Sequence, residues 1–315
     1  MIRNPSQPGY LIRRSRRRAK YRITLIALLI AFSILFISVK LFSLRVGSGI
    51  DENSFIQLWE AEAFDEVYSL SSIELSQNPL DFFLLTIHGF SSYQMAIAQI
   101  SNFYMLQFMD NCIYSLRKAL LLNEGYSDGR VFYVLGKAYY YKGSGYGDLA
   151  IKYLEKALNT GFDASDIYEY LGLAYASVRD FQSSVEAFTL ALDPFGTDSS
   201  SDALFLAIAD SFIALGEEEE AKAYLIRCMD TSRDSNMVFT ARLNLGDLYL
   251  RNGDVDAAEE QFIKVIEEST GNADAHFRLG EVHNARGELV RSRAEWRRAI
   301  QIDPSHRLAR ARLNL

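Results

Sequence analysis

The sequence predicts an all-α protein, with a single N-terminal transmembrane helix followed by an α-solenoid of about seven helix pairs. Three observations predict this fold class: the chain has 5 prolines in 315 residues, one two-helix pattern recurs along it, and an uncharged apolar run precedes the repeats. An apolar fraction of 49% and a charged fraction of 23% are typical of folded rather than disordered chains.

The first element is the apolar run, which we expect to be a transmembrane helix at residues 23–42. Residues 23–39 contain no charge, and twenty helical residues cover about 30 Å, the thickness of a bilayer core. A basic tail at 1–22 precedes the run, so the positive-inside rule places the N-terminus in the cytoplasm and the repeats across the membrane.

Two alternatives to this topology remain open. A cleaved signal peptide has an apolar stretch of about 7–15 residues followed by a small-x-small site, and this run is longer and lacks that site. In a bacterium the repeats would be periplasmic. An organelle anchor in a eukaryote would instead leave the repeats in the cytosol.

The repeat is defined by a small residue on a first helix, followed three residues later by a ring. The small residues are Gly136, Gly172, Ala209, Gly246 and Gly280, and the rings are Tyr139, Tyr175, Phe212, Tyr249 and His283. Residues three apart share one face of a helix. The small residue is therefore expected to admit a neighbouring helix, with the ring filling the space one turn on.

A second helix follows each first helix and carries a bulky residue with a smaller one three positions later. The bulky residues are Leu154, Phe188, Leu225, Phe262 and Trp296, and the smaller ones are Ala157, Ala191, Cys228, Val265 and Ala299. Each pair keeps a nearly fixed internal register, while the gaps between pairs vary. This combination indicates rigid helix pairs joined by variable loops.

This pattern resembles the tetratricopeptide repeat family, whose period is about 34 residues. The residues that match its pattern are Leu135-Gly136 with Tyr139, Leu171-Gly172 with Tyr175, Leu245-Gly246 with Tyr249, Leu279-Gly280, the turn glycines Gly216, Gly253 and Gly287, and Pro304. The resemblance covers residues 129–306. It implies a superhelix whose concave face, lined by first helices, binds polypeptides.

Degenerate or terminal units are expected on both sides of this array. Residues 43–128 are interpreted as degenerate TPR-like helices, with a second helix at 64–79 and a lengthened pair built around Gly89 and Cys112. Residues 307–315 form a polar, Arg-rich capping helix, because terminal repeats expose an outer face to water.

We find no residues in the sequence that predict catalysis, a metal site or a cofactor, so the chain is not expected to be an enzyme. Cys112 and Cys228 fall at small, buried positions of helical patterns, and the four histidines lack metal-ligand spacing. Beyond residue 45 the chain has 23 basic and 40 acidic residues. This acidic body disfavours nucleic acid and favours basic or neutral partners.

The candidate site is the face of the first helices that points away from the small-residue seam. Its expected peptide-binding residues are Tyr133, Lys137, Tyr140, Glu169, Leu173, Leu206, Asp210, Ile213, Leu243, Asp247, Leu250, Phe277 and Glu281, with Ala176 and Asn284 beside them. Leu206, Leu243 and Leu250 could equally pack against neighbouring helices. Asp210, Asp247 and Glu281 recur just after the small residue, so they should line one acidic ridge, which could also be solvated without a ligand.

These observations favour a membrane-anchored scaffold in an envelope complex, holding an amphipathic or basic peptide in a mixed apolar and acidic groove. The alternative is a regulatory or carrier subunit of a membrane enzyme or transporter, with the groove holding a lipid or small ligand. The family's clamp for an acidic C-terminal peptide needs Lys and Asn where this sequence has acids, so that activity is not expected here.

Overall fold

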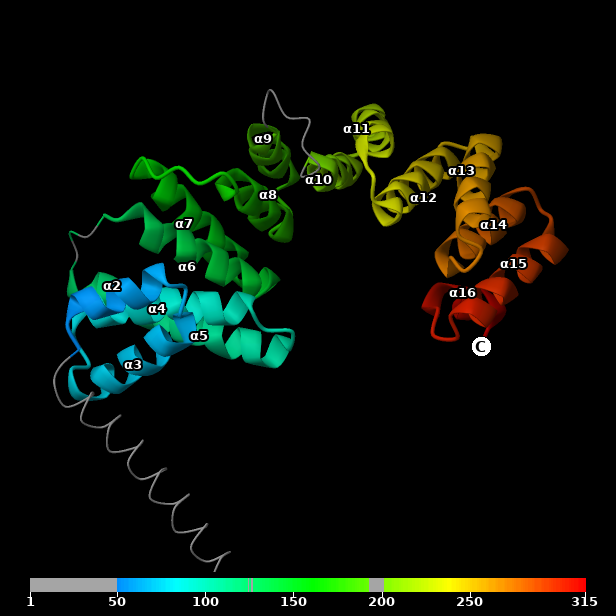
Figure 1. Ribbon diagram of the computed structural model, residues 1–315. Helices are drawn as coiled ribbons and strands as arrows, with labels where there is room; N and C mark the ends of the chain where they lie inside the picture. The colour runs from blue at the N-terminus through cyan, green and yellow to red at the C-terminus, as the bar shows by residue number, and fades with distance from the viewer. Residues whose placement is uncertain (1–49, 124, 126, 193–200) are drawn as a thin grey trace, which may run out of the picture. The chain divides into compact units, whose positions relative to one another are not determined.

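The computed structural model describes residues 50–123, 125, 127–192 and 201–315 (Figure 1). The expected transmembrane segment at 23–42 and the basic tail lie outside these residues. Within the described ranges, every helix is too short or too polar to cross a bilayer. The chain divides into two compact units, the first ending at residue 126 and the second covering 127–315, and each is described separately.

The described part of the first unit contains two helix pairs. Its helices are α2 (Glu52–Glu60), α3 (Phe64–Gln77), α4 (Phe82–Ile97) and α5 (Asn102–Leu122). Asp51 and Asp81 cap α2 and α4 by accepting hydrogen bonds from the backbone N–H groups of Ser54 and Leu84. Phe55, Val67 and Leu84 form one buried cluster of its core.

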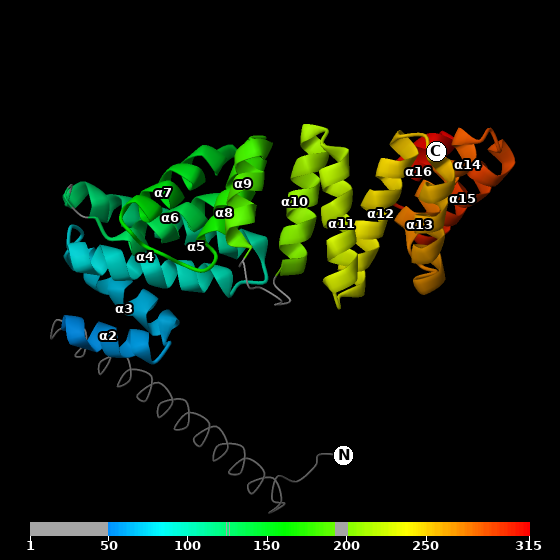
Figure 2. The ribbon, with the colours of Figure 1, turned by 90° about the horizontal axis from the view of Figure 1, so that it is seen from above.

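The described part of the second unit contains five further helix pairs and a closing helix. They are α6 (Gly129–Tyr141) and α7 (Gly147–Asn159), α8 (Ile167–Ser177) and α9 (Phe181–Ala191), α10 (Ser201–Leu215) and α11 (Glu218–Thr231), α12 (Ser235–Arg251) and α13 (Val255–Glu268), α14 (Ala273–Ala285) and α15 (Leu289–Ile302), and α16 (Arg307–Leu313). Each helix packs on the next one along the chain, and α10 to α13 stand side by side in Figure 2.

The small-residue seams predicted from the sequence are confirmed. A Cβ on Gly172 would lie 2.5 Å from Cδ1 of Phe188, and one on Gly280 would lie 2.5 Å from Cδ1 of Trp296. Gly136 and Gly246 face the bulky residues of their own second helices in the same way, and in the first unit Gly89 faces Leu116. Each glycine therefore lets two helix axes approach closely, and the bulky side chain fills the gap left by the missing Cβ.

The turn glycines lie just after the ends of first helices, where the backbone needs a positive φ. Gly216, Gly253 and Gly287 have φ between 78° and 82° and lie just before second helices. This left-handed conformation closes a helix and suits glycine. First helices of successive pairs also contact one another: α6 with α8, α8 with α10, α10 with α12 and α12 with α14. The first helices thus form one continuous face of the second unit.

Candidate functional site

Neighbouring first helices are joined by side-chain contacts at one repeated position, which we call the ladder. In each pair, the first residue directly follows the small residue of its own first helix. The second residue lies two positions before the small residue of the next first helix. The ladder pairs are Lys137 with Tyr170, Asp210 with Asn244, and Asp247 with Arg278. At the corresponding positions between α8 and α10, Leu173 and Ala207 both pack against the core around Phe188. Glu281 makes the last contact, with Arg312 of α16. The ladder runs along the face on which the sequence placed the groove.

At α6 and α8 the ladder passes through a tyrosine cluster, formed by Tyr133, Tyr140, Tyr141 and Tyr170. Lys137 lies inside it, with its Nζ 4.2 Å from the centre of the Tyr170 ring and 4.9 Å from that of Tyr133. The Tyr141 and Tyr170 hydroxyls are 2.7 Å apart, and Tyr140 packs edge-on against Tyr170. The rings of Tyr133 and Tyr170 flank the ammonium, and Lys137 is buried.

Asp166 neutralises this buried ammonium. Its Oδ2 accepts a hydrogen bond from Lys137 Nζ at 2.7 Å, and its Oδ1 accepts one from the Tyr133 hydroxyl. Asp166 is the N-cap residue of α8, but its carboxylate bonds to α6 instead of capping its own helix. Burial, followed by the neighbouring Asp166 carboxylate, raises the pKa of Tyr133 far above its usual range. The Tyr133 hydroxyl therefore stays protonated and acts as a donor.

Glu169 leaves the cluster with one acidic group in excess. It is half-buried one turn after Asp166 and has no hydrogen-bond or ion-pair partner among the described residues. Burial, and then the charge of Asp166, raise the pKa of Glu169, while Lys137 lowers it. Among the described residues, two carboxylates thus share one ammonium, which leaves an excess of negative charge that a further cation would relieve.

The centre of the face, on α8, α10 and α12, is mainly aliphatic. Leu173 packs against the core around Phe188, and Leu206 and Ile213 pack partly buried against the core of the α10–α12 region. Asp210 remains exposed here, and its Oδ1 accepts a hydrogen bond of 3.0 Å from Asn244 Nδ2. Partial desolvation by the surrounding helices raises the pKa of Asp210. Asn244 supplies a neutral donor, so the Asp210 charge is not balanced by that contact.

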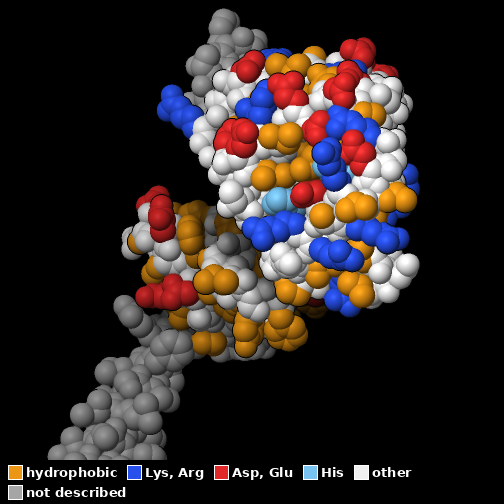
Figure 3. All heavy atoms as spheres, turned by 90° about the vertical axis from the view of Figure 1, so that its right-hand side faces the viewer, with side chains coloured by type: hydrophobic (Ala, Val, Ile, Leu, Met, Phe, Trp, Pro, Cys, Tyr) orange, Lys and Arg blue, Asp and Glu red, His pale blue; other side chains and the backbone are white. Residues whose placement is uncertain are grey.

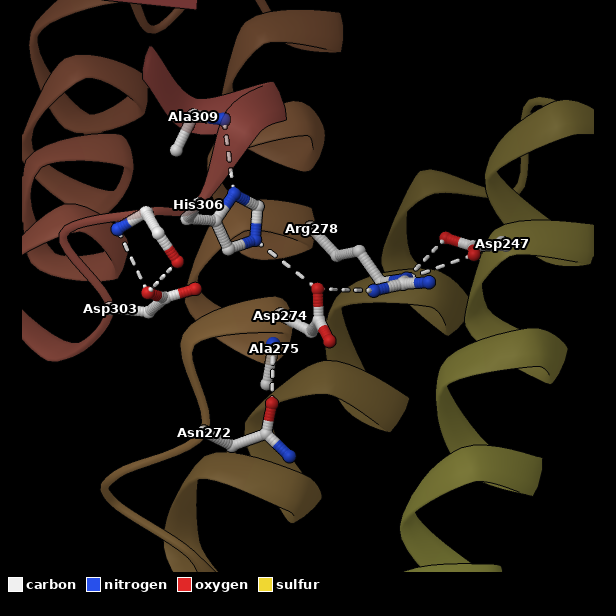
Figure 4. A network of polar contacts seen from close by, with 9 residues as sticks. Asp247, Asn272, Asp274, Ala275, Arg278, Asp303, His306 and Ala309 are labelled. Atoms are coloured by element: carbon white, nitrogen blue, oxygen red, sulfur yellow. Dashed lines mark hydrogen bonds and ion pairs between the residues drawn. The ribbon is translucent and has the colours of Figure 1, made fainter. Parts of the chain in front are cut away.

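At the C-terminal end the ladder consists of ion pairs (Figure 4). Arg278 Nε lies 3.0 Å and 2.9 Å from the two carboxylate oxygens of Asp247, and its Nη1 lies 3.6 Å from Asp274. Asp274 also faces Nε2 of His306 at 3.2 Å. Since Nδ1 of His306 accepts the backbone N–H of Ala309, the ring proton is on Nε2 and points to Asp274. This network joins α12, α14 and the start of α16.

The carboxylate of Glu281 binds the guanidinium of Arg312 through two hydrogen bonds. Figure 3 shows this end of the second unit, where Lys and Arg side chains lie among Asp and Glu side chains. A bidentate pair of this kind fixes the orientation of both side chains. The ladder acids of the two last repeats, Asp247 and Glu281, are therefore already paired within the chain.

Two segments of this array match models of the tetratricopeptide repeat, residues 203–235 and 243–307. The chain contains tetratricopeptide repeats. The C-terminal part of a TPR repeat-containing protein from Cytophaga hutchinsonii is similar in structure, with a TM-score of 0.60 at 14% identity over 82% of this chain and 98% of that one. At this identity the similarity shows the fold alone.

Other solved structures are similar at lower scores. YrrB, described as a TPR protein with an unusual peptide-binding site, has a TM-score of 0.47 at 22% identity, covering 64% of this chain and 98% of its own. MamA has a TM-score of 0.48 at 18% identity, covering 60% of this chain and 97% of its own. No curated protein matches this chain in sequence.

Three residues expected to line the tetratricopeptide groove are buried instead. Leu243 is 8% exposed in the core with Phe262, and Phe277 is 9% exposed in the core with Trp296. Lys137 is 8% exposed because the tyrosine cluster and Asp166 enclose it. These side chains offer little surface to a partner.

The expected acidic ridge also differs from its prediction. Asp247 and Glu281 are on the predicted face, but their arginine partners neutralise them, and only Asp210 keeps an unbalanced charge. Leu250 packs partly buried against the core around Phe262, which favours the packing interpretation left open for it. The ridge is thus a set of contacts between repeats more than a free acidic surface.

Histidines and cysteines occupy structural positions in the repeats. His276 and His283 each place Nδ1 within 2.8 Å of a glutamate oxygen on the following segment, and His88 bonds Ser71 at 2.9 Å. Cys112 and Cys228 are fully buried. Among the described residues, no three His, Cys, Asp or Glu side chains lie close enough together to hold a metal ion.

The functional residues missed in the sequence are the second members of the ladder pairs, together with the acid that neutralises Lys137. They are Asp166, Tyr170, Asn244, Arg278 and Arg312. A signal for four of them was present, because each follows the first member of its pair by 31 to 34 residues, about one repeat period. Asp166 lies at a helix start outside the pattern and gave no such signal.

Proposed function

We propose that this chain is a membrane-anchored tetratricopeptide scaffold, and that the α6–α10 part of its first-helix face holds a basic or amphipathic segment of another protein. Tetratricopeptide proteins generally mediate protein–protein interactions, which supports the class of function. The proposed role is binding, and it requires no catalytic group, metal or cofactor.

The observation that carries this proposal is the half-buried Glu169 carboxylate beside the tyrosine cluster. A lysine or arginine of the partner could pair with Glu169 while its aliphatic stem lies along the half-buried ring of Tyr140. Leu173 and Ile213 continue the face with apolar surface, and Asp210 offers a second unbalanced charge. A segment with two basic residues and apolar residues between them would fit these features.

The proposed anchor is the apolar run at 23–42, with the N-terminus in the cytoplasm and the repeats across the membrane. The ten Lys and Arg residues among the first 45, with no Asp or Glu there, support this orientation. Confinement to a membrane raises the effective concentration of a scaffold for partners in the same envelope. Protease added to sealed cells or spheroplasts should digest the C-terminus; digestion only after the cytoplasm is opened would reverse the orientation.

Site-specific photo-crosslinking in intact membranes tests the groove. A photoreactive amino acid in place of Ile213 should label a polypeptide, and Glu169→Lys should reduce that labelling several-fold, because it replaces attraction by repulsion in a partly desolvated site. Glu267→Lys is the matched control, since it makes the same charge change on an exposed second-helix position. Asp247 is unsuitable for this purpose, because its substitution would break the bond to Arg278.

The outcomes separate the possible roles. Equal labelling in wild type, Glu169→Lys and Glu267→Lys would reject the α6–α10 site. Labelling of lipid or a small molecule in place of a polypeptide would reject the scaffold and favour the carrier or regulatory role.

A further inference from the structure

The turn between α4 and α5 carries an unusual set of exposed apolar side chains, which we call the hairpin tip. It consists of Ile97, Ile100, Phe103 and Tyr104, which are 48%, 105%, 70% and 54% exposed. The rings of Phe103 and Tyr104 pack edge to face with centroids 5.4 Å apart. Soluble proteins rarely leave several large apolar residues together in water, so the tip is a candidate contact surface.

The hairpin around this tip lacks formal charge. From Phe82 to Met109 the sequence contains no Asp, Glu, Lys or Arg, and the flanking acids are Asp81 and Asp110. The one histidine in this stretch, His88, is buried, and burial lowers its pKa, so it is neutral at pH 7. An exposed helical turn that faced only water would normally carry charged residues. The lack of charge fits an apolar medium better than a charged protein surface.

The place where the chain enters this unit allows the tip to reach the membrane. Ile50 packs against the buried cluster that contains Leu84, at the base of the hairpin. The helix α4 runs thirteen residues from Leu84 to Ile97 at the start of the tip, about 20 Å along the helix axis. Residues 43–49, when extended, span up to about 25 Å. A linker starting at the end of the apolar run at 42 is therefore long enough for the tip to lie at the bilayer surface.

We infer that the hairpin tip inserts into the headgroup region of the bilayer and gives the first unit a second membrane contact. This inference rests on the anchor in the proposed function but not on the peptide-binding face. Ile100 and Phe103 would enter the boundary of the acyl chains. Tyr104 would keep its hydroxyl among the headgroups, as aromatic residues do at membrane interfaces. The inserted tip would restrict how the first unit tilts above the membrane.

Depth-dependent fluorescence quenching tests this contact with the full-length chain. The chain is reconstituted in vesicles of phosphatidylcholine and phosphatidylglycerol at 3:1, with a polarity-sensitive fluorophore on Ile100→Cys or Phe103→Cys. Leu190→Cys is the matched control, because Leu190 is 64% exposed on α9 of the second unit. The native Cys112 and Cys228 are fully buried, so they do not compete for the label.

Lipids brominated on the acyl chain should quench both tip probes at least twofold and shift their emission to the blue, while the Leu190 probe stays unquenched. Flotation of the same vesicles reports the anchor independently. Flotation without quenching at Ile100 and Phe103, or with equal quenching at Leu190, overturns the tip contact and leaves the anchor in place. A chain that does not float with the vesicles overturns the anchor and the tip contact together.

Discussion

Replacing Gly172 by Ala should loosen the α8–α9 pair, because the new Cβ would lie 2.5 Å from Cδ1 and 2.7 Å from Cε1 of Phe188. Phe188 is 1% exposed, so its ring has no free space to move into. Overpacking of a core costs about 1–3 kcal/mol, and the better helix propensity of alanine offsets about 1 kcal/mol of this. We expect a net loss of about 1 kcal/mol.

The third repeat suggests how to compensate this loss. In the α10–α11 pair, Ala209 and Leu225 belong to one core cluster, at the positions that a glycine and an aromatic ring occupy in the α8–α9 pair. Combining Gly172→Ala with Phe188→Leu recreates that pair, whereas Phe188→Leu alone leaves a cavity beside the glycine. The double variant should therefore be more stable than the sum of the single effects predicts, with a coupling of about 1 kcal/mol.

Amide hydrogen exchange of the full chain in detergent is the appropriate assay, because repeat arrays need not unfold as one unit. Gly172→Ala should speed exchange in α8 and α9 about fivefold, which corresponds to about 1 kcal/mol. Gly271→Ala is the control, since no atom lies within 4 Å of its added Cβ. Unchanged exchange in Gly172→Ala, or strictly additive effects in the double variant, would refute the steric explanation of the seam.

Two further predictions concern the ladder and the first unit. Arg312→Ala should speed exchange in α16 by about two- to fivefold, because a half-exposed bidentate pair with Glu281 contributes about 0.5–1 kcal/mol; exchange equal to wild type would show that this pair does not hold α16. Burial lowers the pKa of His88 below its ordinary value, so the folded unit keeps the ring neutral while the unfolded chain binds a proton below about pH 6.5. Stability of the first unit should thus fall between pH 7 and pH 5 by exchange in α3 and α4. His88→Asn should weaken that dependence, and an identical pH profile in this variant would exclude His88 as its cause.

The seams could be predicted from the sequence because they depend on short-range patterns. A small residue on one helix and a bulky residue a fixed distance later must meet if the two helices form an antiparallel pair. The same reasoning identified the turn glycines, whose positive φ follows from their place after a helix end. In the first unit it related Gly89 and Cys112 to one lengthened pair, where Gly89 contacts Leu116.

The groove could be predicted only as a face, because the state of each side chain depends on the neighbouring repeat. From the sequence, Lys137 is expected to be an exposed cation. In the structure, Asp166 at the start of the next first helix lies 2.7 Å from its ammonium. From the sequence, Asp247 and Glu281 are expected to form a free acidic ridge. In the structure, Arg278 and Arg312, about one repeat later in the chain, pair with them. Residue types set the face, and the contacts between repeats decide which of its charges remain unbalanced.

The change in ladder chemistry along the array limits where a partner can bind. At α12–α16 a partner cation would have to displace Arg278 or Arg312, and the displaced guanidinium would lose its hydrogen bonds to both oxygens of a carboxylate, which the new cation could at best replace. At the proposed site on α6–α10, a binding partner would meet the Glu169 carboxylate, which has no hydrogen-bond or ion-pair partner among the described residues. Beside it lie rings that are already ordered by their contacts with Lys137 and with one another. Pairing there relieves repulsion instead of exchanging equivalent bonds, and little side-chain entropy is lost from the scaffold. The binding free energy should therefore be concentrated at Glu169 and its tyrosines, with Asp210 next, although the sequence places acids along the whole face.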